Sequence, residues 1–253
     1  MPKAITRTLD TPKVVVFVHF GSNTVVLDEN LDEVSRPTFM AGIEASILAA
    51  RQYFWDNCDG RTFTALPAIR YDDPREMATI FSEDGGTLSS VVTANLCTAH
   101  TRKEINLASP WRLNCYTTPM PFTDGSFIGL TTQASYLNID VRYTGPTVSH
   151  DWPGFMFVGS DFYGKLLGGV KTDPGDSLNS GRGVFAHELA HGFGGETFPI
   201  SAALPHDAGA DDPRHAWPNL MNGGSYPSTG FTPYQKHRVL RSPFLTPHAV
   251  RPS

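Results

Sequence analysis

The sequence predicts an α/β (α+β) fold, with a mixed twisted sheet, a helix that backs it and a small irregular C-terminal lobe. Residues 13–20 (Lys-Val-Val-Val-Phe-Val-His-Phe) are mostly β-branched or aromatic, which is typical of a strand buried on both faces. A stretch that ends near Trp55 repeats its apolar residues at helical spacing, and residues 61–71 again favour a strand. The order strand, helix, strand favours a parallel pair with a right-handed crossover.

The long helix has a start signal of its own. Ser35-Arg36-Pro37-Thr38 offers a capping side chain and a proline suited to the first turn. The apolar positions that should pack this helix on the sheet are Phe39, Ile43, Ile47, Ala50 and Phe54. Pro67 lacks a backbone N–H, so the strand at residues 61–71 should be an edge strand or contain a bulge.

Two later segments also favour strands. Residues 127–143 alternate weakly and predict one or two strands. Residues 155–158 form a short apolar run between two glycines, which predicts another. We expect one domain made of two lobes, residues 1–194 and residues 195–253, with a cleft between them.

Composition excludes some classes of function. The chain has 253 residues, a net charge of -5 and no basic run, which argues against a nucleic-acid partner. The first residues lack the apolar stretch of a signal peptide, and no apolar run is long enough to span a bilayer. The sequence leaves the cellular compartment open. We expect a secreted protein whose signal peptide is absent from this sequence. Cys58, Cys97 and Cys115 have no Cys-x-x-Cys spacing and permit at most one disulfide, so we expect buried thiols or one bridge.

The chemistry-bearing motif is His187-Glu188-Leu189-Ala190-His191. If residues 184–192 are helical, the two histidines stand one turn apart on the same face and can bind one Zn²⁺ together. Glu188 lies about a third of a turn from His187, where it can hold a metal-bound water but is poorly aimed as a ligand. This arrangement is typical of a zinc hydrolase.

The motif and its surroundings resemble the metzincin zinc peptidases. Gly194 follows the second histidine by three residues, and Met221 lies downstream in Pro-Asn-Leu-Met-Asn. The resemblance implies a metzincin-like fold, a zinc cofactor, Glu188 as general base and a methionine turn at Met221; a lone core methionine is the other interpretation. Residues 155–195, with an apolar strand, Ser-Asp-x-Tyr-Gly, Gly-Gly and HExxH, resemble the IgA-specific metallopeptidase family. In a metzincin, the strand at residues 155–158 would be an edge strand that pairs with extended substrate.

The third zinc ligand is open, because two histidines do not complete a catalytic site. The metzincin pattern places it at Thr197, which is a poor zinc ligand. Leu204-Pro205-His206 resembles the ligand-bearing sequence of several metzincins, displaced by an insertion, so His206 is the first candidate. It could instead merely cap a surface turn. The other candidates are Glu196, Asp207 and His215.

A closing helix is predicted over residues 231–240, with Thr232 as N-cap and Pro233 in the first turn. His237 within it should be solvated. Tyr226 and Tyr234 are both candidates to stabilise an oxyanion, as a tyrosine does in some metzincins.

We therefore expect a zinc-dependent endopeptidase, monomeric, that acts on protein or peptide substrate. Zinc held by His187, His191 and His206 would activate water, and Glu188 would take its proton. Two alternatives stay open: a catalytically inactive metzincin-like binding domain, and a zinc hydrolase that acts on non-peptide amides or glycoproteins.

Overall fold

The central strand is β1 (Lys13–Phe20), as its β-branched sequence predicts, and five of its valines and phenylalanines in succession are buried. The computed structural model describes residues 13–26, 32–76, 112–117, 129–132, 155–158, 181–193, 230–242 and 244–253. Because successive residues of β1 are buried, both faces of the strand are covered, which is typical of a strand within a parallel sheet.

The main sheet is mixed, as predicted, and its strand order in the described part of the chain is β3-β1-β5-β7-β6. Its other strands are β3 (Thr64–Ala65), β4 (Ile69–Asp72), β5 (Arg112–Thr117), β6 (Gly129–Thr132) and β7 (Phe155–Val158). β1 pairs in parallel with β3, β4 and β5, and β5 pairs in parallel with β7. β6 alone among these strands runs antiparallel, against β7.

The prediction of one strand over residues 61–71 was wrong, because the chain divides there into three. β2 (Arg61–Thr62) leaves the main sheet and pairs antiparallel with β8 (Thr246–Pro247), while β3 and β4 both pair with β1. Pro67 lies in the interruption between β3 and β4, where its missing N–H removes no ladder hydrogen bond. Beside it, the backbone N–H of Ala68 donates to the carboxylate of Glu44.

The expectation that residues 155–158 form an edge strand was also wrong. β7 lies between β5 and β6, so both of its edges are hydrogen-bonded. Strand order across a sheet is not encoded in the local sequence, and the antiparallel β6 takes the outer position instead. Of the strands that the structure describes, β6 ends this side of the sheet.

The long helix α1 (Arg36–Asn57) begins where the sequence predicts. The hydroxyl of Ser35 accepts a hydrogen bond from the Thr38 N–H, and a proline occupies the first turn. Its buried positions include all five apolar residues predicted to face the core. The helix ends in a turn in which Asp59 and Gly60 both have positive φ, at 54° and 70°.

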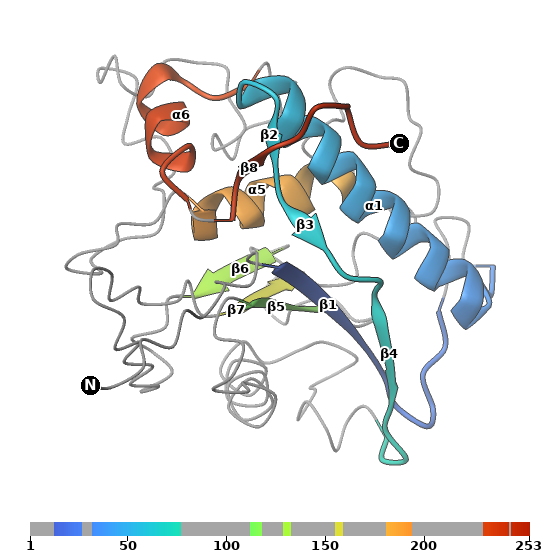
Figure 1. Cartoon of the computed structure of the whole chain (residues 1–253). Coiled ribbons are helices and arrows are strands. Elements are labelled where there is room, and N and C mark those ends of the chain that lie inside the picture. The colour runs from blue at the N-terminus through green and yellow to red at the C-terminus, as the bar shows by residue number, and fades with distance from the viewer. Residues whose placement is uncertain are drawn as a thin grey trace, which may run out of the picture.

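A second helix, α5 (Gly181–Phe193), contains the HExxH sequence and packs against α1, β6 and β7. Figure 1 shows α1 and α5 on the same side of the main sheet. Their contact is lined by aromatic side chains, with Phe54 of α1 and Phe193 of α5 at 5.2 Å between ring centroids. The core thus lies between the sheet and two helices, one of which carries the candidate metal ligands.

The end of the chain returns to the N-terminal half. Helix α6 (Pro233–Val239) has the predicted N-cap at Thr232, and Gln235 completes a capping box. Beyond it lie residues 244–253, which we call the C-terminal strap. The strap pairs with β2 through β8 and makes side-chain hydrogen bonds with α1. The proposed division into lobes at residues 194 and 195 stays a prediction.

Two of the three cysteines are described, and both are buried thiols. Burial raises the pKa of the Cys58 thiol to about 12, and burial also raises the pKa of Cys115. Both therefore remain protonated at neutral pH and are poor zinc ligands. Cys97 lies outside the described residues. No helix among the described residues is long and apolar enough to cross a membrane.

Phe54→Ala is expected to lower the free energy of unfolding by about 3–5 kcal/mol, the range for removing a buried phenylalanine. Phe54 is 0% exposed, and its ring contacts those of Phe63, Phe193 and Phe231. Urea unfolding followed by circular dichroism measures the loss. Val250→Ala, at a side chain 78% exposed, should stay within about 0.5 kcal/mol of wild type. Equal losses in the two variants would contradict this assignment of the core.

Candidate metal centre

Helix α5 brings the two predicted histidine ligands together. The Nε2 atoms of His187 and His191 lie 3.1 Å apart, and the two rings are 4.7 Å apart between centroids at 82°. The helix produces this approach because residues four apart stand one turn apart on one face. His191 is buried and His187 is half-buried. The two Nε2 atoms are therefore close enough to share one partner.

The separation of the two nitrogens fits a zinc ion. A Zn–N distance of about 2.0–2.1 Å and the 3.1 Å gap give an N–Zn–N angle of about 100°. This lies close to the tetrahedral angle that zinc sites in proteins adopt. The same gap is also within hydrogen-bond distance, with the donor set by the tautomer. The pair thus has a spacing that suits either one shared metal ion or a direct hydrogen bond between the rings.

The other side of α5 anchors the helix. Ala186, Leu189, Ala190 and Phe193 are each at most 3% exposed and belong to the main hydrophobic core. These positions recur at three- and four-residue spacing, as expected for the buried stripe of a helix. His187 and His191 are not part of this stripe. Packing of the stripe holds the helix, and the helix backbone in turn positions the two imidazoles.

Glu188 lies between the histidines in α5, so its backbone is helical as predicted. Its side chain is outside what the structure describes. The role of general base therefore stays a prediction from the motif.

The remaining candidates of the proposed site also lie outside the described residues. They are Gly194, Glu196, Thr197, His206, Asp207, His215, Met221 and Tyr226. Within the residues that are described, no cluster of three or more His, Cys, Asp or Glu side chains is suitable for a metal ion. A third metal ligand would have to come from a residue outside the described ranges, and His206 and its alternatives are such residues.

Tyr234, a candidate from the sequence, and two histidines outside the motif have other surroundings. The His19 ring packs against Tyr71 at 4.7 Å between centroids, so this histidine belongs to the β1–β4 pair. His237 is exposed on α6, as predicted. The Tyr234 hydroxyl accepts a hydrogen bond from Arg238 at 3.2 Å.

No model of a known protein family matches the chain, and the search of curated proteins found no match. Solved structures do match. OgpA from Akkermansia muciniphila is 17% identical, with a TM-score of 0.50 over 92% of this chain and 62% of that one. The two chains share a fold. A second crystal form of OgpA gives a TM-score of 0.48 at 17% identity, over 92% of this chain and 61% of that one.

Metalloproteinase-II from Bacteroides fragilis also matches, with 11% identity and a TM-score of 0.43, over 93% of this chain and 54% of that one. The chain thus spans 54% to 62% of the length of these structures. Of these matches, the one with a TM-score of 0.50 shows a shared fold with OgpA and no more. The comparisons do not support the narrower resemblance to the IgA-specific family.

The sequence interpretation missed an aromatic contact at the end of α5. Phe193, two residues after His191, stacks on Phe244 of the C-terminal strap at 5.4 Å and 21° between ring planes. The only signal in the sequence is a phenylalanine at the end of a predicted helix. Its partner, distant in the chain, is set by tertiary packing.

Proposed function

We propose that the chain is a zinc-dependent endopeptidase, in which His187 and His191 bind the metal and His206 is the third ligand. The observation that carries this proposal is the 3.1 Å separation of the two Nε2 atoms on a helix whose opposite stripe is buried. Surface helices of globular proteins generally have such a stripe, so the argument for a metal depends on the close approach of the two nitrogens. The shared fold with OgpA is consistent with the proposal and carries no activity by itself.

The proposed division of labour follows from the residue types. When bound, zinc supplies a Lewis acid that activates water and polarises the scissile carbonyl. His187 and His191 fix its position through a rigid helical turn. Glu188 takes the proton of the attacking water and then gives it to the leaving amine, so that one carboxylate serves both steps.

The third ligand is tested by metal analysis of purified wild type, His206→Ala and Glu196→Ala. We expect about one zinc per chain in wild type and in Glu196→Ala, and loss of zinc and of casein hydrolysis in His206→Ala. The reason is that a two-nitrogen site should release its metal to dialysis, whereas three ligands should retain it. Loss in Glu196→Ala alone would transfer the role to that carboxylate.

The same samples separate the other functions left open by the sequence. Wild type that holds no zinc and cleaves nothing would favour a non-catalytic domain with this fold. Wild type that holds zinc and cleaves mucin but not casein would favour a hydrolase that acts on glycoproteins.

A further inference from the structure

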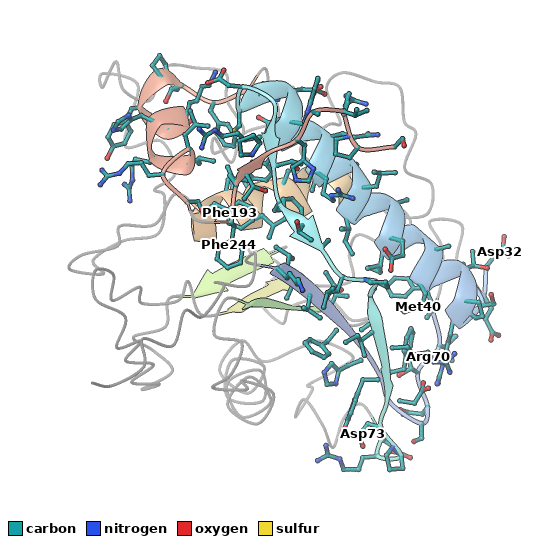
Figure 2. All side chains as sticks on the ribbon, in the orientation of Figure 1. Asp32, Met40, Arg70, Asp73, Phe193 and Phe244 are labelled. Atoms are coloured by element: carbon teal, nitrogen blue, oxygen red, sulfur yellow. The ribbon has the colours of Figure 1, made fainter. Side chains whose placement is uncertain are left out.

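The last turn of α5 is held by an aromatic cage. Phe193 is 3% exposed, and its ring contacts Phe54 at 5.2 Å, Phe63 at 5.5 Å and Phe244 at 5.4 Å. The first two contacts are tilted or edge-on, whereas Phe244 is stacked at 21°. Figure 2 shows Phe193 and Phe244 together at one end of α5. The terminal residue of the metal helix is thus enclosed by three separate segments of chain.

The stacked partner is supplied by the C-terminal strap, and the strap is fixed to α1 and the turn that follows it. The Trp55 indole donates to the carbonyl of His248 at 3.2 Å, and the His248 N–H donates to Gly60 at 2.9 Å. Arg251 makes two hydrogen bonds to Asp56, at 2.7 and 2.8 Å. α1 also provides Phe54. Phe193 is therefore held by α1 and by the strap that is hydrogen-bonded to α1.

This cage matters for the metal because of where His191 lies. His191 is the third residue from the end of α5, in the turn whose carbonyls have no partners further along the helix. Such turns fray unless tertiary contacts hold them. Fraying would rotate the His191 ring away from His187, which lies a full turn deeper in the helix. The 3.1 Å chelate therefore requires the last turn to remain helical.

We propose that the Phe193–Phe244 stack is a positioning device for the metal centre, through which the C-terminal strap sets the affinity for zinc. Neither ring touches the metal; they act through the backbone of α5 on His191. The inference rests on the proposed function, in that it takes His187 and His191 as zinc ligands.

The test compares Phe244→Leu with a matched control, Phe231→Leu. Both substitutions remove one ring from the same aromatic cluster and leave an apolar side chain. Phe231 packs on Tyr53 and Phe54 at 5.6 and 5.7 Å, so it joins the cluster through α1, and among the described side chains it makes no ring contact with Phe193. Zinc dissociation constants come from competition with a chromophoric chelator, and urea unfolding of the metal-free proteins measures stability.

We expect Phe244→Leu to weaken zinc binding about tenfold, the lower end of the range for residues that orient metal ligands. Phe231→Leu should stay within about twofold of wild type even if both variants lose similar stability, because it leaves the last turn of α5 untouched. Hydrogen exchange of the metal-free proteins should show faster exchange at Leu189 to Phe193 in Phe244→Leu alone. Should Phe244→Leu fail to fold, Phe193→Leu repeats the test from the other side of the stack.

The outcomes are distinguishable. Unchanged zinc affinity and unchanged exchange in Phe244→Leu, with tight zinc in wild type, would overturn the positioning role and leave the proposed function intact. Equal weakening in Phe231→Leu would also overturn it, because general loss of stability would then explain the effect. Wild type without tight zinc would contradict the proposed function and this inference together.

Discussion

Glu188→Gln is expected to keep about one zinc per chain and to lower kcat for casein hydrolysis by about 10²- to 10⁴-fold, the range for a lost general acid–base group. Glutamine has nearly the shape of glutamate, but its amide does not accept a proton at neutral pH. His187 and His191, the proposed ligands, should stay in place, since α5 is held by its buried stripe and not by residue 188. Zinc content and initial rates are measured on the same preparation.

The matched control for this variant is Glu33→Gln, the same change at an exposed carboxylate outside the helix. Its zinc content and its rate should equal those of wild type. If Glu188→Gln keeps its rate, the proposed mechanism is wrong, whatever the zinc content. If it loses its zinc as well, Glu188 supports the metal and the kinetic result no longer isolates a proton-transfer role.

Local sequence predicted the parts of the fold that depend on local physics. Ser35 and Thr232 cap their helices because a hydroxyl beside a proline-containing first turn satisfies an N–H that the helix leaves unpaired. β1 was identified by its β-branched residues, whose packing favours a buried strand. In each case the sequence signal and the structure it specifies lie within a few residues of one another.

The errors concern strand order and pairing, which depend on distant parts of the chain. β2 has only two residues and pairs with β8 near the other end of the sequence, so no periodicity within β2 indicates its partner. The resemblance to metzincins made β7 an edge strand, yet β6 pairs with its outer edge. The prediction of one strand over residues 61–71 failed because composition does not reveal that Pro67 separates two pairings with β1.

The candidate site also has parts that the local sequence predicts and parts that depend on distant segments. The two histidines could be predicted because a helix fixes the geometry of residues four apart. The third ligand could not be predicted with one answer, because the metzincin spacing indicates Thr197, which is a poor zinc ligand, and leaves His206 and its alternatives as candidates. The stack of Phe193 on Phe244 could not be predicted either, since it joins a helix end to a strap fixed by contacts with α1.

His191→Ala is expected to weaken zinc binding by about 10²- to 10³-fold and to abolish casein hydrolysis. Structural zinc sites bind with roughly 10–16 kcal/mol, which over four ligands is about 2.5–4 kcal/mol each, and 1.4 kcal/mol is tenfold. In this variant His187 remains, but the second nitrogen of the pair, which lies 3.1 Å away in wild type, is lost. Competition with a chelator gives the dissociation constant, and urea unfolding checks that the buried position tolerates alanine.

His237→Ala is the control for this variant, because His237 is exposed on α6 and has no assigned role at the metal. Its zinc affinity and its rate should match wild type. Zinc affinity retained in His191→Ala would exclude the chelate and leave His191 as a packing residue of α5. The two variants are informative together, because Glu188→Gln should separate turnover from metal binding whereas His191→Ala should lose both. That contrast is expected of a helix that carries ligands and proton-transfer group in one motif, and neither a degraded site nor a chance HExxH would produce it.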